Sequence, residues 1–313
     1  MRYRRITSVE ELSHLSESKP DELFLVPTFE VAEALITKGI DSALVAIDWP
    51  SVSEKSDLLP PPPSSIGSLF PRCAFQFDQP ILVVLPTYNE RQNLEIVTNA
   101  IRKYLMTDIL IVDDNSPDGT GILADELSRR HPFIHVLHRP QKDGLGSAYL
   151  AGFQWALARD YYLIIEMDCD LSHAPWDLPR LVYHSTSADL VIGSRYIPGG
   201  SVEGWDVRRR LISQLANCYV RLFLGSKIRD WTGGFRCFRR TLLTQLDLQG
   251  VYAKGYVFQV EMAWRALRRN ARVREIPIRF RNRAHGRSKL GWPVIYEAIK
   301  TVPLMAMGRM ASE

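Results

Sequence analysis

The stretch Tyr162-Leu-Ile-Ile-Glu-Met-Asp-Cys-Asp-Leu-Ser-His173 decides the fold that this sequence predicts. An apolar run at residues 163–165 gives way to two carboxylates, Asp168 and Asp170, which is typical of a buried parallel strand with acids at its carboxyl end. Side chains alternate along a strand, so both carboxylates point to one side if the strand geometry continues through them. Because open α/β sheets bind ligands at the carboxyl ends of their strands, we expect a site here.

The chemistry of this pair favours a divalent cation. Two hard oxygen ligands so placed suit Mg²⁺ or Mn²⁺, and an ion held there would most naturally meet a diphosphate. The alternative is that an Asp-x-Asp pair belongs to a turn or a helix N-cap, where aspartate is also common. The position of the pair directly after a buried strand favours the metal.

Strands and helices alternate on both sides of this stretch, which predicts an α/β fold with a mostly parallel sheet. The expected strands cover residues 81–85, 109–112, 134–138, 162–167 and 189–192, and the expected helices cover residues 90–104, 120–130 and 144–158. Most of these strands end in polar residues. We therefore expect functional side chains to converge on one edge of the sheet.

The ends of the first two strands carry residues that suit a nucleotide. Tyr88 and Glu90 are placed to line a base and ribose pocket, and Asp114 suits a base edge or a ribose hydroxyl. For residues 113–119 the alternative is a tight turn with an Asx cap, since turns use these residue types. The two glycines within residues 144–146 predict either close approach to a phosphate or a flexible turn.

Further candidates follow in the second half of the chain. Arg195 comes after the strand at 189–192 and is placed to hold a phosphate bidentately. Residues 230–236 are expected to form another polar loop at a strand end. Gln259 and Glu261 lie on a predicted helix and could meet a sugar or an acceptor, with a capping or surface role as the alternative.

A basic segment near the C-terminus predicts a lid. Residues 271–290 hold seven Arg and Lys against one acid, with Arg283, Arg287 and Lys289 grouped around Gly286. Such a density beside a flexible loop fits a segment that clamps a diphosphate or an acceptor phosphate once substrates bind. A solvated basic face is the plainer interpretation.

An apolar stripe follows the basic cluster at residues 208–210. Its members are Leu211, Leu215, Cys218, Tyr219 and Leu222. A basic cluster before an amphipathic helix predicts an element that lies in a membrane interface, although a stripe of this spacing also fits core packing. The tail from residue 292 is apolar but short and contains Pro303, which favours a surface-lying or partner-docking helix over a membrane span.

Length and composition allow one large α/β domain and a small appendage, because 313 residues with 46% hydrophobic and 24% charged residues are ordinary for a globular chain. We expect an acidic strand–helix–strand appendage of unknown role at 1–49, a Pro/Ser-rich linker at 50–73, a main domain at 74–291 and an amphipathic tail at 292–313. Within the appendage, strands are expected at 23–27 and 43–47 and a helix at 30–38.

The charge of the chain is unevenly distributed. Residues 1–80 hold 7 Lys and Arg against 12 Asp and Glu, which leaves +9 for the rest of a chain whose total is +4. Such a basic domain suits a phosphate-bearing ligand or an anionic membrane surface. No nucleic-acid-binding signature is present, so nucleic acid is not an expected partner. The four cysteines form no CxxC pair, and we expect a reducing, cytosolic setting.

Nine segments occur in order through the main domain: Pro86-Thr-Tyr-Asn-Glu90, Asp113-Asp-Asn-Ser-Pro-Asp-Gly-Thr120, Gly144-Leu-Gly-Ser-Ala-Tyr149, Met167-Asp-Cys-Asp-Leu-Ser-His173, Gly193-Ser-Arg-Tyr196, Gly204-Trp-Asp206, Thr232-Gly-Gly-Phe-Arg236, Lys254-Gly-Tyr-Val-Phe-Gln259 and Gly286-Arg-Ser-Lys-Leu-Gly291. Together they resemble the motif series of dolichol-phosphate (polyprenyl-phosphate) mannose synthases, within glycosyltransferase family 2. The short form without transmembrane helices is the most similar. The resemblance covers residues 81–291, about two thirds of the chain.

The resemblance implies a GT-A fold, which is the Rossmann-like fold of nucleotide-diphospho-sugar transferases. It implies transfer of mannose from GDP-mannose to dolichyl or polyprenyl phosphate, with inversion. By position it implies a metal site at Asp168, Asp170 and Ser172; a nucleotide-sugar site at Pro86, Tyr88, Glu90, Asp114, Asp168, Gln259 and Arg283; catalytic roles for Asp170, Arg195 and Lys289; and an acceptor-phosphate site at Arg195 and Arg209. Some relatives have Gln in place of Ser172, and relatives commonly have Glu in place of Arg287.

An acceptor phosphate is already anionic near pH 7, so catalysis should rest on positioning and charge neutralisation rather than on a strong base. The resemblance also implies a peripheral location on the cytosolic face of a membrane, with a possible integral membrane subunit as an anchor. Two alternatives stay open. One is a donor other than GDP-mannose, such as UDP-glucose. The other is a non-catalytic scaffolding paralogue, which the intact Asp168, Asp170 and Lys289 disfavour.

Overall fold

The computed structural model describes the backbone of residues 2–5, 22–26 and 45–47, and it describes residues 77–253, 255, 257–282 and 292–308. Within the last range, residues 292–295 are described by their backbone alone. The chain divides into two compact units, the smaller of which holds residues 1–76 together with 102–106. Among the described residues, no helix is both long enough and apolar enough to cross a membrane.

The smaller unit contains a parallel sheet of three strands in the order β1-β2-β3: β1 (Arg2–Arg5), β2 (Glu22–Val26) and β3 (Val45–Ile47). β2 and β3 occur where the apolar runs predict strands. β1 was not predicted, because its Arg-rich sequence lacks the apolar alternation by which strands are recognised. The helix expected at 30–38 lies outside the described residues.

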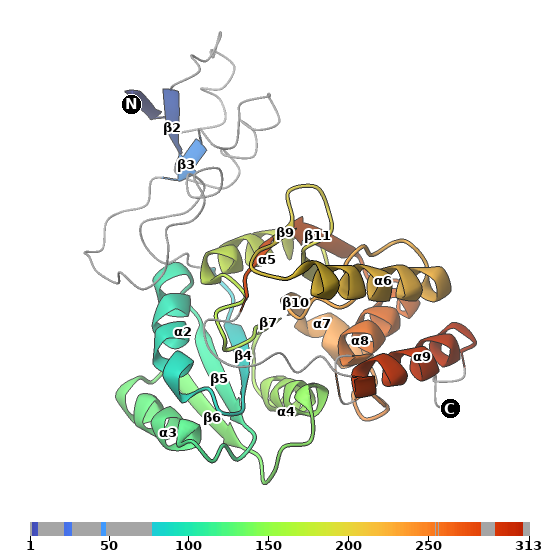
Figure 1. Cartoon of the computed structure of the whole chain (residues 1–313). Coiled ribbons are helices and arrows are strands. Elements are labelled where there is room, and N and C mark those ends of the chain that lie inside the picture. Colours follow the sequence, from blue (N-terminus) through green and yellow to red (C-terminus); the bar gives the residue numbers. More distant parts are fainter. Residues whose placement is uncertain are drawn as a thin grey trace. The chain divides into compact units, whose positions relative to one another are not determined.

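The larger unit is built on a sheet of seven strands in the order β11-β8-β10-β7-β4-β5-β6 (Figure 1). They are β4 (Ile81–Thr87), β5 (Asp108–Asp113), β6 (Ile134–His138), β7 (Leu163–Glu166), β8 (Leu190–Ser194), β10 (Arg236–Arg239) and β11 (Val273–Pro277). All neighbouring strands are parallel except at β10, which is antiparallel to both β7 and β8. The prediction of a mostly parallel sheet is confirmed.

β10 corrects the interpretation of residues 230–236 as a loop at the end of a strand. The loop follows a helix and leads into β10. Because β10 has four residues with an arginine at each end, its sequence does not show the apolar run of a buried strand. Tertiary contacts with β7 and β8 decide that it is extended.

Eight α-helices are described in this unit or at its border: α2 (Arg91–Tyr104), α3 (Thr120–Arg130), α4 (Leu145–Leu157), α5 (Leu178–His184), α6 (Val207–Leu224), α7 (Arg240–Gln245), α8 (Val257–Arg268) and α9 (Trp292–Ala306). α4 packs on β4, β5 and β7, α8 packs on α4, and α9 packs on α6 and α8. A small parallel sheet joins β9 (Ser201–Val202) to β12 (Arg279–Phe280).

Aromatic side chains fill the layer between the sheet and these helices. The rings of Tyr149 and Phe153 on α4 contact that of Phe258 on α8, and Phe153 also meets Phe238 of β10 edge-on at 5.4 Å. All four side chains are fully buried. Aromatic side chains bury large areas, so this cluster fixes α4 and α8 against each other and against β10.

Candidate functional site

A cavity of about 290 Å³ opens at the carboxyl ends of β4, β5 and β7. Its lining includes Pro86, Thr87, Tyr88, Glu90, Asp114, Lys142, Gly144, Leu145, Asp168, Cys169 and Asp170. Six of these were predicted as site residues from the sequence: Pro86, Tyr88, Glu90, Asp114, Asp168 and Asp170. The parallel strands therefore bring together side chains that lie up to 84 positions apart in the sequence.

Asp168 and Asp170 face this cavity for a reason other than strand alternation. β7 ends at Glu166, so neither aspartate belongs to a strand. Leu171 has a left-handed backbone with φ of 63°, and the Ser172 N–H donates to Asp170 Oδ1 at 3.0 Å. The carboxylates are thus presented by a tight turn, and the condition under which strand alternation would orient them is not met. Asp170 serves the turn and lines the cavity at once.

A buried histidine supports the backbone of Asp168. The Asp168 N–H donates to His173 Nδ1 at 3.1 Å, so the ring proton of the neutral histidine is on Nε2. The ring is packed against Phe235 and Phe280, with centroids at 4.9 and 5.3 Å. Burial lowers the pKa of His173, and the nearby charge of Asp168 opposes this shift only in part. The ring is therefore neutral. Burial also raises the pKa of Tyr149, so its hydroxyl stays protonated and donates to Asp168 Oδ1 at 3.4 Å.

We expect His173→Phe to lower the free energy of unfolding by about 1–2 kcal/mol in a urea titration, because the Asp168 amide loses its acceptor while the ring packing is kept. His131→Phe is a matched control. That ring also lies beside a phenylalanine, Phe133, at 5.2 Å, and is partly exposed. Equal losses in the two variants would show that the Asp168 amide is not involved.

The segment from 113 to 119 combines the two roles that the sequence left open. Asp113 accepts from the backbone N–H of Ser116 at 3.1 Å, and Asp118 accepts from the first N–H of α3 at 3.0 Å, as in a capped turn. Asp114 instead lines the cavity and forms an ion pair with Arg139 Nη1 at 2.6 Å. Burial raises the pKa of Asp114, and Arg139 opposes this shift.

Lys142 is a cavity residue that the sequence did not identify. Its Nζ lies 4.0 Å from the centroid of the Tyr88 ring. It lies four residues after the end of β6 at His138, a strand to which we assigned no functional residue from the sequence. A lysine between a strand and Gly144, which begins a predicted helix, is the sequence signal that would have indicated a cation at this edge. Lys142 adds a positive charge to a cavity edge that otherwise carries several carboxylates.

The two glycines at the start of α4 have different roles. Gly144 lines the cavity and has a φ of 94°, which favours glycine. Gly146 faces α8, where a Cβ atom would come within 2.7 Å of the Phe258 Cβ. The backbone conformation of the first glycine fits a turn at the cavity edge, and the second is required by helix packing.

Several predicted site residues do not line the cavity. Arg283 and Lys289, with the rest of the expected lid, lie outside the described residues. Gln259 and Ser172 are buried near it, at 2% and 1% exposure. Glu261 is fully buried, accepts from the backbone N–H of Ala253 at 2.9 Å and from Arg265 Nε at 2.9 Å, and so holds the loop before α8; it is not a surface residue, and it does not line the cavity.

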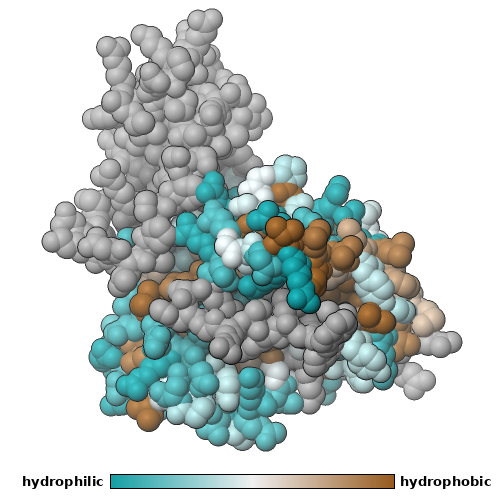
Figure 2. Space-filling model, viewed as in Figure 1, coloured by the Kyte–Doolittle hydropathy of each residue, from teal (hydrophilic) through white to brown (hydrophobic). Residues whose placement is uncertain are grey.

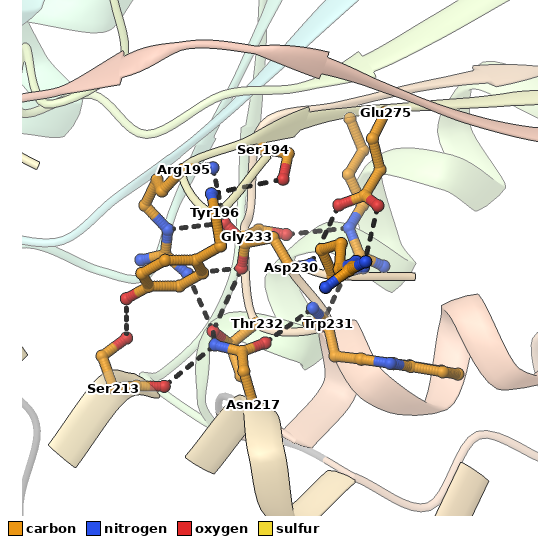
Figure 3. A network of polar contacts seen from close by, with 12 residues as sticks. Ser194, Arg195, Tyr196, Ser213, Asn217, Asp230, Trp231, Thr232, Gly233 and Glu275 are labelled. Atoms are coloured by element: carbon orange, nitrogen blue, oxygen red, sulfur yellow. Dashed lines mark hydrogen bonds and ion pairs between the residues drawn. The ribbon is translucent and has the colours of Figure 1, made fainter. Parts of the chain in front are cut away.

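Arg195 does not present its guanidinium to the cavity in the way we expected. Its Nε and Nη2 donate to the two carboxylate oxygens of Asp230, both at 2.7 Å, and Nη2 also donates to Thr232 Oγ1 at 2.8 Å (Figure 3). This edge of the guanidinium is therefore occupied and cannot hold a phosphate bidentately. Burial alone would raise the pKa of Asp230, but Arg195 holds it below its usual value, so the pair is ionised.

The same network joins α6 to the loop at 230–233. Asn217 donates from Nδ2 to Thr232 Oγ1 at 3.0 Å and accepts from the Trp231 N–H at 2.8 Å (Figure 3). Ser213, one turn earlier on α6, accepts from the Tyr196 hydroxyl at 2.7 Å. These contacts link residues that are far apart in the sequence, so no local sequence pattern predicts them.

Arg209 and Arg195 meet at a shared aromatic ring. The guanidinium of Arg209 lies 4.2 Å from the Trp205 ring, and that of Arg195 lies 5.7 Å from it. Arg209 Nη1 also donates to Asn282 Oδ1 at 3.0 Å. The structure thus brings the two predicted acceptor-phosphate arginines to one place.

Two buried ionisable residues lie opposite each other at the ends of neighbouring strands. Glu166 and Arg236 are cross-strand neighbours in β7 and β10, and both are fully buried. Arg236 donates to the carbonyl oxygens of Trp231, Gly233 and Gln259 at 2.6–2.8 Å, which ties the loop to α8. Burial raises the pKa of Glu166 to about 8 against the attraction of Arg236.

Comparison with known proteins agrees with this architecture. Residues 82–247 match the model of the family described as glycosyl transferase family 2. A polyprenol monophosphomannose synthase of Mycolicibacterium smegmatis is 49% identical over 224 residues, which cover 71% of this chain and 84% of that protein. An undecaprenyl-phosphate mannosyltransferase of Micrococcus luteus is 45% identical over 223 residues, which cover 71% of this chain and 92% of that protein.

Among solved structures, a glucosyl-3-phosphoglycerate synthase from Mycobacterium tuberculosis, in complex with Mn²⁺, UDP-glucose and phosphoglyceric acid, has a TM-score of 0.53 at 20% identity. The match covers 75% of this chain and 81% of that one, and it shows a shared fold. The sheet topology, the cavity at its carboxyl edge and this likeness establish the GT-A fold that the family resemblance implied. The match to the family model covers more than half of this chain, and the chain therefore belongs to glycosyl transferase family 2.

Proposed function

We propose that this protein transfers mannose from GDP-mannose to the phosphate of a dolichol or another polyprenol, with inversion at the anomeric carbon and release of GDP. One observation carries the proposal. Identity of 45–49% extends over 84% and 92% of two proteins whose names state polyprenyl-phosphate mannosylation. At this level of identity over nearly the whole of both relatives, conservation of the donor and acceptor is the simplest expectation.

The cavity suits a nucleoside diphosphate sugar. Tyr88 and Asp114 line the cavity, where they would meet the base and ribose, and Pro86 and Glu90 belong to the same lining. Lys142 supplies a cation at the same edge. A nucleoside diphosphate would otherwise meet a surface rich in carboxylates, so the site requires further positive charge.

A divalent cation fits the residues at this edge. Asp168 and Asp170 both face the cavity, and the hydroxyl oxygen of Ser172 is buried and makes no hydrogen bond to the described part of the chain. Within that part, no group of three or more His, Cys, Asp or Glu side chains could hold a metal. Two carboxylates suffice for Mg²⁺, which proteins usually bind through one or two carboxylates together with substrate phosphates. We propose Mg²⁺ or Mn²⁺ at these residues, which when bound would neutralise the leaving diphosphate.

The remaining residues act by positioning. A phosphate monoester has a second pKa of about 6, so the acceptor is already a nucleophilic anion near neutral pH. We propose that Arg209 binds the acceptor phosphate, and that Arg195 holds the loop at 230–233 in place through Asp230. Roles for Gln259, Arg283 and Lys289 at the donor stay part of the proposal.

The first test is transfer of radiolabel from GDP-mannose, and in parallel from UDP-glucose, to a short polyprenyl phosphate in detergent. We expect mannosyl lipid that depends on Mg²⁺ or Mn²⁺ and disappears with a chelator. Glucosyl lipid in its place would move the donor to UDP-glucose. No product from either donor would favour a non-catalytic scaffold or a missing membrane subunit.

We further propose a peripheral location on the cytosolic face of a membrane, because the acceptor is a lipid and the chain beyond residue 80 carries a net charge of +9. An integral membrane anchoring subunit is compatible with this location. The division into an appendage at 1–49, a linker at 50–73, a transferase domain at 74–291 and a tail at 292–313 is our proposal for the domain organisation.

A further inference from the structure

α6 buries two polar side chains, Ser213 and Asn217, together with Val220, and turns a row of large apolar side chains outward. Ser213 and Asn217 are buried and bonded to Tyr196, Thr232 and the backbone of residue 231. A surface helix of a globular protein normally does the reverse, with its apolar stripe against the core. The core-packing interpretation is therefore wrong for Leu211, Leu215, Cys218 and Leu222, and it holds only for Tyr219, which is half-buried against the core.

The outward residues form a continuous stripe. The α6 apolar face consists of Val207 (75% exposed), Leu211 (52%), Leu215 (65%) and Leu222 (79%). Spacings of four, four and seven residues place these side chains on one side of the helix, and the exposed Cys218 lies between the last two. Figure 2 shows hydrophobic residues gathered over α6. Single exposed apolar residues are ordinary, but an aligned row of large ones indicates an interaction surface.

A second helix extends this surface. α9 packs beside α6, where the Tyr219 hydroxyl donates to the carbonyl oxygen of Ile299 at 3.1 Å. On α9, Tyr296 and Ile299 are 70% and 55% exposed, and Met307 just beyond it is 56% exposed. The apolar area is therefore shared by two helices that are fixed to each other.

The charge around the α6 apolar face selects the partner. Residues 207–229 contain six Arg and Lys and no Asp or Glu. Of these, Arg208, Arg210, Lys227 and Arg229 are exposed. An apolar stripe bordered by cations matches a lipid surface with anionic headgroups, in which apolar side chains reach the acyl boundary and cations meet phosphates.

The first turn of α6 is also connected to the cavity edge. Arg209 donates to Asn282, and the backbone N–H of the neighbouring Arg281 donates to the carbonyl oxygen of Ser172 at 3.1 Å. A lipid phosphate at the bilayer surface would thus arrive beside Arg209, which these two hydrogen bonds connect to the turn that carries Asp168 and Asp170.

We propose that the α6 apolar face, with the adjoining exposed residues of α9, docks in the headgroup region of an anionic bilayer and so presents the protein to its lipid acceptor. The purpose of this docking rests on the proposed function. The docking itself does not depend on catalysis and can be measured without substrates.

The test is flotation of the full chain with phosphatidylcholine vesicles that contain about 30 mol% phosphatidylglycerol, at about 0.1 M salt. We expect the combined variant Leu211→Gln, Leu215→Gln and Leu222→Gln to weaken vesicle binding on the order of a hundredfold. Glutamine is a good helix former, and these side chains are exposed, so the far-UV circular dichroism should not change.

Ile122→Gln is the matched control for Leu222→Gln. Both residues lie on helices, and Ile122 is 68% exposed on α3, outside the α6 apolar face. We expect Leu222→Gln alone to weaken binding several-fold and Ile122→Gln to leave it unchanged. Arg208→Glu should weaken binding to the anionic vesicles and leave the weaker binding to pure phosphatidylcholine unchanged.

Activity separates this inference from the proposed function. The combined glutamine variant should transfer mannose to a short acceptor in solution at the wild-type rate, and should lose transfer to a long-chain acceptor in vesicles. Wild-type protein that transfers mannose but does not bind vesicles would overturn the docking proposal alone. So would a variant that binds as well as wild type, or a wild-type dimer that the substitutions convert to monomer without any change in vesicle binding.

Discussion

Asp168→Asn is expected to lower the rate of mannosyl transfer on the order of a thousandfold, with little change in fold. The substitution keeps the size of the side chain and removes its charge at the cavity edge. The remaining carboxylate of Asp170 cannot supply the same charge to a divalent ion bound with a diphosphate. Rates measured from GDP-mannose over a range of Mn²⁺ concentrations check this expectation.

A binding measurement makes the result specific. In the presence of GDP, Mn²⁺ binding followed by electron paramagnetic resonance should be at least tenfold weaker in Asp168→Asn than in wild type. Asp125→Asn is the control, because this carboxylate is half exposed on α3 and pairs with His138. Metal-dependent transfer at the wild-type rate by Asp168→Asn would contradict the proposed metal site.

Asp230→Ala is expected to destabilise the fold by about 3–5 kcal/mol, because it leaves the buried guanidinium of Arg195 without its carboxylate. Denaturant titration measures this loss. The double variant Asp230→Ala with Arg195→Met should recover part of it, since no unpaired charge is then buried. The exposed pair of Arg130 and Glu95, 3.7 Å apart, is the control: Glu95→Gln should cost less than about 0.5 kcal/mol.

The pH dependence of this pair has a definite sign. The pKa of Asp230 is lowered in the folded protein, so the stability that the pair contributes is present above the unfolded value of about 3.9. That stability is lost as the pH falls through the folded pKa. The difference in unfolding free energy between wild type and Asp230→Ala should therefore be constant from neutral pH down to about pH 5 and shrink in stronger acid. A difference that grows on acidification would show that the two side chains are not an ion pair.

Some features followed directly from local sequence. The apolar runs at 81–85 and 109–112 predicted β4 and β5, and the polar residues after them predicted the cavity edge. These predictions succeed because a strand buried on both faces must be apolar throughout, and its carboxyl end must then meet solvent. For the segment 113–119 the sequence predicts either a turn or a ligand site. In the structure Asp113 stabilises the turn, and Asp114 lines the cavity.

Other features depended on contacts between distant residues. Lys142 reaches the cavity because β6 lies beside β5, and Arg195 faces Asp230 because β8 lies beside β10. The outward direction of the α6 stripe was decided by Asn217 and Ser213, whose polar partners lie elsewhere in the chain. A helical period shows that a stripe exists, but it does not show which side of the helix the rest of the protein covers.

By itself, the sequence determined the alternation of strands and helices, the family resemblance and the position of the carboxylates after β7, because these depend on residues close together in the chain. The tertiary structure alone decided that the Arg195 guanidinium pairs with Asp230, that Gly146 is needed for helix packing, and which face of α6 meets solvent. Each of these is a choice among partners that lie tens of residues apart, and burial and hydrogen bonding select between them only after the chain has folded.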